Sequence, residues 1–114
     1  VLGTVLARGA WGRGPLVSGR LVLIHPEDEV PVVTGDDIVL LEELEESCFS
    51  LLANAGAVIV ENKSVAADRF FDEHEGAIAV ITEVPDAFER LEDGVTVTVD
   101  GNEKIVYEGV VLPE

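Results

Sequence analysis

The stretch Ala57-Val58-Ile59-Val60, preceded by Gly56 and followed by Glu61, decides the fold class. A short apolar run bounded by a turn residue and a charged residue indicates a β-strand that is covered on both faces. Comparable apolar runs stand on either side of it, at residues 38–41 and 77–81. Strands of this kind need a layer of structure on each face, so the sequence predicts a mixed α/β domain of two or three layers.

The segment between the first two of these runs has the periodicity of a helix. Leu44, Cys48, Leu51 and Leu52 stand at the spacing of one helical face. Glutamates crowd the first turns, where the helix dipole favours negative charge. We therefore expect an amphipathic helix that ends before Gly56 and packs its apolar face on the sheet.

Two further helices are predicted. Ser64 is placed to cap the first of them, and Gly76 stands at its end. Pro85 occupies the first position of the other helix, which Gly94 follows. The apolar face of the helix after Ser64 consists of Ala67, Phe70, Phe71 and His74.

Both ends of the chain are expected to add short strands. Residues 9–15 are predicted to be a loop, because three glycines and a proline stand there. Ser18-Gly19 is predicted to be a turn, and Asp100-Gly101 is predicted to join two strands of a hairpin. The strands predicted in these parts are residues 3–7, 20–24, 95–99 and 105–107.

The composition excludes several classes of protein. A chain of 114 residues that is 47% hydrophobic has the apolar area for one folded core and is not disordered. No apolar run approaches the roughly 18 residues that a membrane span needs. A formal charge of −16 disfavours nucleic acid and anionic membranes as partners. The single cysteine forms no internal disulfide and suits the reducing cytoplasm.

The charge also indicates a salt-adapted source for the protein, and it is unevenly distributed along the chain. Twenty-three acids stand against five arginines and two lysines, which fits adaptation to high salt, with an ordinary acidic protein as the alternative. Residues 1–26 contain three arginines and no acid. A positive N-terminal segment beside an acidic body predicts docking within the domain or onto a neighbouring domain.

Three segments in this order resemble the mobile, phosphohistidine-swivelling domain of phosphoenolpyruvate-utilising enzymes. They are the glycine loop and Ser-Gly of residues 12–22, the central strand, helix and strand of residues 35–61, and the terminal hairpin of residues 91–109. The same domain is the extra C-terminal domain of some pyruvate kinases. The resemblance implies a swivelling β/β/α fold: residues 1–114 form a single compact domain with stacked sheets and two to three helices, cut from the C-terminus of a longer protein.

The segment after Glu61 departs from this resemblance. In the family, a glycine pair and then Thr-Ser-His open a helix here, and the histidine accepts a phosphoryl group. Residues 62–69 of this chain contain no glycine, threonine or histidine. Ser64, Ala67 and Asp68 therefore mark a degenerate phosphoacceptor region, and we expect no catalytic residue, metal or cofactor. The expected role is structural or regulatory, through contacts with other domains or subunits of a pyruvate-kinase-like parent enzyme. A homo-oligomer is one form that this assembly can take.

Two alternatives to this role stay open. One is an active phosphocarrier that uses a relocated histidine, either His74 or His25. The other is a stand-alone module that binds an anion at the glycine loop. The residues predicted to form either an interface or an anion site are Arg8, Trp11, Arg13 and Arg20.

Overall fold

A computed structural model describes residues 4–25 and 33–110, and in these residues β-strands predominate over helix. The strands are β1 (Val5–Arg8), β2 (Trp11–Arg13), β3 (Leu16–Ile24), β4 (Asp37–Leu41), β5 (Ala57–Val60), β6 (Ala79–Thr82), β7 (Thr96–Asp100) and β8 (Ile105–Glu108). The helices are the 3₁₀-helix η1 (Glu46–Cys48) and the short α-helices α1 (Ala67–Glu73) and α2 (Ala87–Arg90). None of the helices in the described part of the chain is long and apolar enough to cross a membrane.

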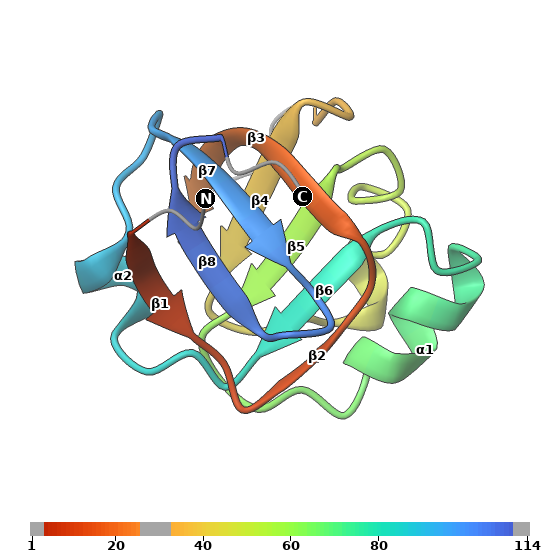
Figure 1. The fold of residues 1–114 in the computed structure, drawn as a ribbon. Coiled ribbons are helices and arrows are strands. Elements are labelled where there is room, and N and C mark those ends of the chain that lie inside the picture. Colours follow the sequence, from red (N-terminus) through yellow and green to blue (C-terminus); the bar gives the residue numbers. More distant parts are fainter. Residues whose placement is uncertain (1–3, 26–32, 111–114) are drawn as a thin grey trace.

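All eight of these strands belong to one mixed sheet, in the order β1-β8-β7-β3-β4-β5-β6-β2 (Figure 1). The neighbouring strands β3, β4, β5 and β6 run parallel, and the other pairs are antiparallel. The end strands β1 and β2 follow each other in the chain, and the link between them bonds to both ends of the sheet. Gly9 donates its N–H to the carbonyl of Lys104 (2.8 Å), and Ala10 donates to that of Thr82 (3.1 Å). The expected stacked sheets are therefore one sheet that closes on itself.

The parallel strands are covered on both faces, as their apolar sequences predict. In β5, Ala57 and Ile59 point into one cluster of buried side chains, whereas Val58 and Val60 point into another. The first cluster, the inner core, lies within the curled sheet and includes residues of α2. The second cluster, the outer core, lies between the parallel strands and the segments around η1 and α1. Two cores in 114 residues make one compact domain.

The helix predicted after β4 is wrong in type. The chain forms only the 3₁₀-helix η1 and a series of turns. Leu44 and Leu52 are buried as predicted, but Leu51 is 52% exposed, and Phe49 packs in the outer core instead. The Phe49 ring meets the ring of Phe70 edge to face at 5.1 Å. Burying this larger aromatic side chain outweighs the helical spacing of the leucines.

The two other helices are present but begin differently from the prediction. Ser64 does not cap α1, since its hydroxyl donates to the carbonyl of Leu44 (3.4 Å), and the N-cap position is Ala66. Gly76 ends the α1 segment with a left-handed φ of 72°, as its position predicts. Asp86, also left-handed, stands directly before α2, so Pro85 is not the first helical residue.

The N-terminal glycines serve close packing between strands rather than a loop. Residues 11–13 form β2, paired with β6, and Ser18-Gly19 lies inside β3 instead of forming a turn. A Cβ on Gly12 would lie 2.4 Å from the carbonyl oxygen of Gly101, so only glycine lets β2 pass the β7–β8 turn. The strand predicted at residues 3–7 is β1, but Gly3 lies outside the described residues.

Candidate functional site

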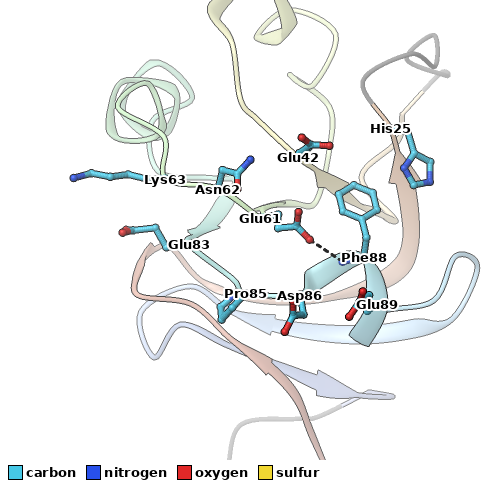
Figure 2. A pocket seen from close by; sticks show the side chains of 10 residues that line it. All are labelled: His25, Glu42, Glu61, Asn62, Lys63, Glu83, Pro85, Asp86, Phe88 and Glu89. Atoms are coloured by element: carbon cyan, nitrogen blue, oxygen red, sulfur yellow. Dashed lines mark hydrogen bonds between the residues drawn. The ribbon is translucent and has the colours of Figure 1, made fainter.

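The four parallel strands end at one edge of the sheet, and the residue after each of them lines the same pocket (Figure 2). These residues are His25 after β3, Glu42 after β4, Glu61 after β5 and Glu83 after β6. The pocket has a volume of about 740 Å³. Side chains that follow parallel strands meet at their carboxyl edge, which is where open α/β sheets bind ligands.

The pocket carries a strong excess of negative charge. Five carboxylates line it together with a single ammonium group, that of Lys63, which extends away from Glu42 and Glu61 in Figure 2. Glu61 is held in place because its Oε2 accepts the backbone N–H of Phe88 (3.2 Å). The remaining residues of the lining are His25, Asn62, Pro85 and Phe88.

One wall of the pocket is aromatic. The ring of His25 stacks on the ring of Phe88, with 4.7 Å between centroids and 29° between planes. Phe88 lies on α2, whose start is fixed by two residues in the left-handed region, Glu83 and Asp86 (φ 58° each). A non-glycine residue in this region costs about 1 kcal/mol or more, so packing of α2 on the inner core holds the wall in place.

This pocket was not among the sites predicted from the sequence. Its signal was nevertheless present, because Glu42, Glu61 and Glu83 stand within two residues of the end of an apolar run. What the sequence did not show is that these runs are parallel neighbours, which brings the three glutamates to one edge.

The carboxylates of the pocket do not converge as metal ligands do. In residues 4–25 and 33–110, no three His, Cys, Asp or Glu side chains are grouped closely enough to hold a metal ion. Divalent cations need several oxygen ligands within about 2.6 Å. The negative charge of the pocket is therefore spread over a wider area than one metal ion.

The degenerate phosphoacceptor region begins at the rim of this pocket, since Asn62 and Lys63 line it. Farther along, at the start of α1, the side chain of Ala67 is buried and that of Asp68 is exposed. The Asp68 carboxylate accepts a hydrogen bond from the guanidinium of Arg13 on β2. The first turn of α1 thus presents an internal ion pair.

Arg13 makes three contacts that tie β2 to α1. Besides Asp68, its guanidinium lies 3.5 Å from the carboxylate of Asp72. It also lies over the ring of Phe71, at 4.4 Å from the centroid. We call this group of residues the Arg13 clamp. Its positive charge is compensated within the domain.

The other residues predicted for an interface or anion site are not brought together. Arg8, Trp11 and Arg20 lie on β1, β2 and β3, and no two of these strands are neighbours in the sheet. Trp11 is half-buried and packs against the outer core. Arg20 lies 3.6 Å from the carboxylate of Asp37.

The two histidines lie in different surroundings. His74 ends α1, its ring lies against Phe70 at 4.3 Å, and its Nδ1 donates to the Phe70 carbonyl (2.7 Å). His25, by contrast, lines the acidic pocket, on the side opposite Asn62 and Lys63 in Figure 2.

Comparisons with known proteins find distant relatives among phosphoenolpyruvate synthases and pyruvate kinases. No protein-family model matches the chain. It is 27% identical to the phosphoenolpyruvate synthase of Aeropyrum pernix over 98% of its length, and 23% identical to pyruvate kinase 2 of a Synechocystis species over 99%. It spans only 14% and 19% of these two relatives.

Two solved structures share the fold. They are aconitase X of Thermococcus kodakaraensis, with a TM-score of 0.61 and 12% identity, and a UPF0107 protein, with a TM-score of 0.61 and 13% identity. The alignments cover 94% and 95% of this chain, and 95% and 97% of the other chains. At such identities the likeness concerns the fold alone. From the sequence relatives, the chain is a distant homologue, over nearly its whole length, of part of the phosphoenolpyruvate synthases and pyruvate kinases.

Proposed function

We propose that this chain is a swivelling-type domain that has lost its phosphoacceptor and acts as a structural or regulatory domain of a larger phosphoenolpyruvate-utilising enzyme. A pyruvate-kinase-like parent, in which such a domain is a C-terminal addition, is the form that the sequence resemblance favours. The role is assembly: the domain contacts other domains or subunits of its parent. The surplus of acids supports a salt-adapted source.

One observation carries the proposal. The family has its histidine in the segment that follows β5. In this chain, the same segment has Ala67, whose side chain is buried, and Asp68, which forms an ion pair with Arg13. An alanine has no nucleophilic atom. The Asp68 carboxylate is engaged by the guanidinium of Arg13, so it is not a free nucleophile. The position is therefore occupied, but by groups that accept no phosphoryl group.

The surroundings of the histidines also argue against a relocated phosphocarrier. His25 shares its pocket with five carboxylates, which repel an incoming phosphate. His74 has one ring nitrogen engaged by the Phe70 carbonyl. Its neighbours in the chain, Glu73 and Glu75, are acidic. Among the residues that the structure describes, acids outnumber cations around both histidines, which disfavours binding of a phosphoryl donor.

A phosphorylation assay tests the proposal. The 114-residue chain is incubated with labelled phosphoenolpyruvate and with the catalytic parts of a phosphoenolpyruvate synthase, and the product is treated with acid or base. We expect no acid-labile, base-stable label, whereas the swivelling domain of the synthase, as positive control, becomes labelled. Label on this chain that His25→Gln or His74→Gln abolishes would overturn the proposal and establish a phosphocarrier.

The anion-binding alternative has less support. Arg13, inside the glycine loop, and Arg20 are already paired with Asp68 and Asp37. Sulfate would have to displace a carboxylate to bind either of them, and the third arginine, Arg8, lies on a different strand from both. Thermal unfolding at matched ionic strength distinguishes the two: a larger rise in Tm with sulfate than with chloride would favour the anion-binding module.

The assembly role has its own test. The sequence predicts that Trp11 and Arg13 contribute to the contact surface, so Trp11→Ala and Arg13→Ala are expected to weaken association of the parent enzyme. Light scattering after size-exclusion chromatography measures this. Because Trp11 packs on the outer core and Arg13 forms the Arg13 clamp, each variant must first be shown to be folded. Unchanged assembly with folded variants would exclude this surface.

A further inference from the structure

The acidic pocket combines three features that one kind of ligand would use. Its five carboxylates surround an opening of about 740 Å³, within the range of roughly 300–1,000 Å³ that is usual for ligand pockets. Its wall contains the stacked rings of His25 and Phe88. Two residues after Lys63, which lines the pocket, the chain exposes the apolar side chain of Val65, which is 93% accessible. An exposed apolar residue beside a charged pocket is typical of a surface that contacts another protein.

The charge of the pocket selects among ligands. Phosphate and carboxylate groups are repelled, because the lining has five acids and only one lysine. The side chain of this lysine, Lys63, also extends away from Glu42 and Glu61. A metal ion does not fit, because no three ligating side chains in the described residues are close enough to share one. A larger organic cation fits both facts, since it can contact carboxylates that lie too far apart for a metal.

We propose that the pocket receives an arginine side chain of a neighbouring domain or subunit. The guanidinium group is planar and carries five N–H donors, so it can stack on the Phe88 and His25 wall while it donates to the surrounding carboxylates. Glu61, oriented by the N–H of Phe88, stands next to that wall. Val65 then packs against the partner's surface outside the pocket.

Arginine is preferred to lysine for a geometric reason. An ammonium group is a compact point charge that binds one or two carboxylates and is strongly hydrated. In this pocket the carboxylates are spread, and one wall is aromatic. Both features increase the affinity for a flat, weakly hydrated cation, whereas the affinity for an ammonium group comes mainly from the charge.

This inference specifies the partner surface of the proposed assembly role and rests on it, but its test does not use the parent enzyme. The 114-residue chain, labelled with ¹⁵N, is titrated with N-acetyl-arginine amide at constant ionic strength and followed by NMR. N-acetyl-citrulline amide, which has nearly the same shape without the charge, and N-acetyl-lysine amide are the matched ligands. We expect shifts of the amides of Phe88, Glu61 and Glu42, with the arginine derivative bound at least 3-fold more tightly than either other ligand.

Variants locate the binding. Glu42→Gln and Glu89→Gln each remove one pocket carboxylate and are expected to raise the Kd of the arginine derivative about 2- to 5-fold, the effect of one partly exposed ion pair. Glu108→Gln, on the exposed side of β8, removes the same charge elsewhere and is expected to leave the Kd unchanged. Both pocket glutamates are partly or fully exposed, so these variants should fold.

Several outcomes would overturn the inference. Equal binding of citrulline or lysine would remove the preference for a planar cation. An equal loss with Glu108→Gln would show that only the overall charge attracts the ligand. Shifts away from the pocket, or no binding, would refute the site. Covalent phosphate on the chain would instead refute the proposed loss of the phosphoacceptor and leave the pocket result standing, so the two failures are distinguishable.

Discussion

The Arg13 clamp gives the most direct test of how this domain is held together, through the variant Arg13→Ala. Arg13 joins the N-terminal strand β2 to α1 by two ion pairs and by contact with the ring of Phe71. The side chains of Asp68 and Asp72 are 63% and 65% exposed, so solvent screens both pairs strongly. Exposed pairs contribute about 0.2–1 kcal/mol and an exposed cation–π contact about 0.5–1 kcal/mol. The variant should therefore lower the free energy of unfolding by about 1–2 kcal/mol.

Part of this loss comes from charges left behind. Asp68 and Asp72 are four residues apart on α1, and without Arg13 they repel each other by a few tenths of a kcal/mol. Urea unfolding, followed by circular dichroism, measures the free energy without adding salt. A 1 kcal/mol loss corresponds to a fall in Tm of roughly 4–8 °C for a domain of this size.

A matched control separates the clamp from net charge. Arg90→Ala, on the exposed end of α2, makes the same change in total charge. We expect it to cost less than half as much as Arg13→Ala at low salt. In 1 M KCl, where the screening length is about 3 Å, the difference should shrink but not vanish, because contact with Phe71 remains. Equal losses in the two variants at low salt would refute the reasoning.

Three further predictions concern the cores, the glycines and salt. Phe70→Ala removes a fully buried ring of the outer core and should lower the free energy of unfolding in urea by about 3–5 kcal/mol. Leu51 is half-exposed, so Leu51→Ala should lower it by under about 1 kcal/mol, and similar losses in the two variants would contradict the assigned packing. Gly12→Ala places a Cβ 2.4 Å from the Gly101 carbonyl and should cost about 1–3 kcal/mol, while Gly35→Ala meets only a contact at 3.9 Å and should have little effect on Tm. Finally, the chain's charge of −16 predicts that its Tm rises towards molar KCl; a flat or falling Tm would exclude salt adaptation.

The strands β4, β5 and β6 were predictable from the sequence, as strands covered on both faces, because they are apolar throughout; their parallel pairing was not. The runs at β4, β5 and β6 need no knowledge of their neighbours, since each is bounded by turn residues and charged residues. The β2 strand was not predictable in the same way. Its glycine-rich sequence is typical of a loop, and only the approach of the Gly101 backbone explains why those residues are small.

The η1 segment shows a second limit of sequence reasoning. Helical spacing put Leu51 on the buried face and took no account of Phe49. In the folded domain, the Phe49 ring reaches Phe70 on α1, a contact between segments 21 residues apart that periodicity does not reveal. A long-range aromatic contact thus determined which side of a local segment is buried.

The candidate site illustrates the same difference between local and long-range information. The absence of a histidine after β5 is a local fact, and the sequence alone supplies it. That Arg13 takes up the charge of Asp68 is a long-range fact, because the two residues are 55 positions apart. The acidic pocket also depends on residues from four strand ends.

Because of the distribution of charge, salt should affect the stability of the fold and the affinity of the pocket in opposite directions. Arg13, Arg20 and Arg69 are all paired with carboxylates of their own chain, so they do not neutralise the pocket. Added KCl screens repulsion among the surplus acids and should stabilise the fold. The same screening weakens attraction between the pocket carboxylates and an arginine. If salt adaptation and arginine docking are both correct, rising KCl must raise Tm while it raises the Kd of the arginine derivative, and binding must then depend increasingly on the aromatic wall of Phe88 and His25.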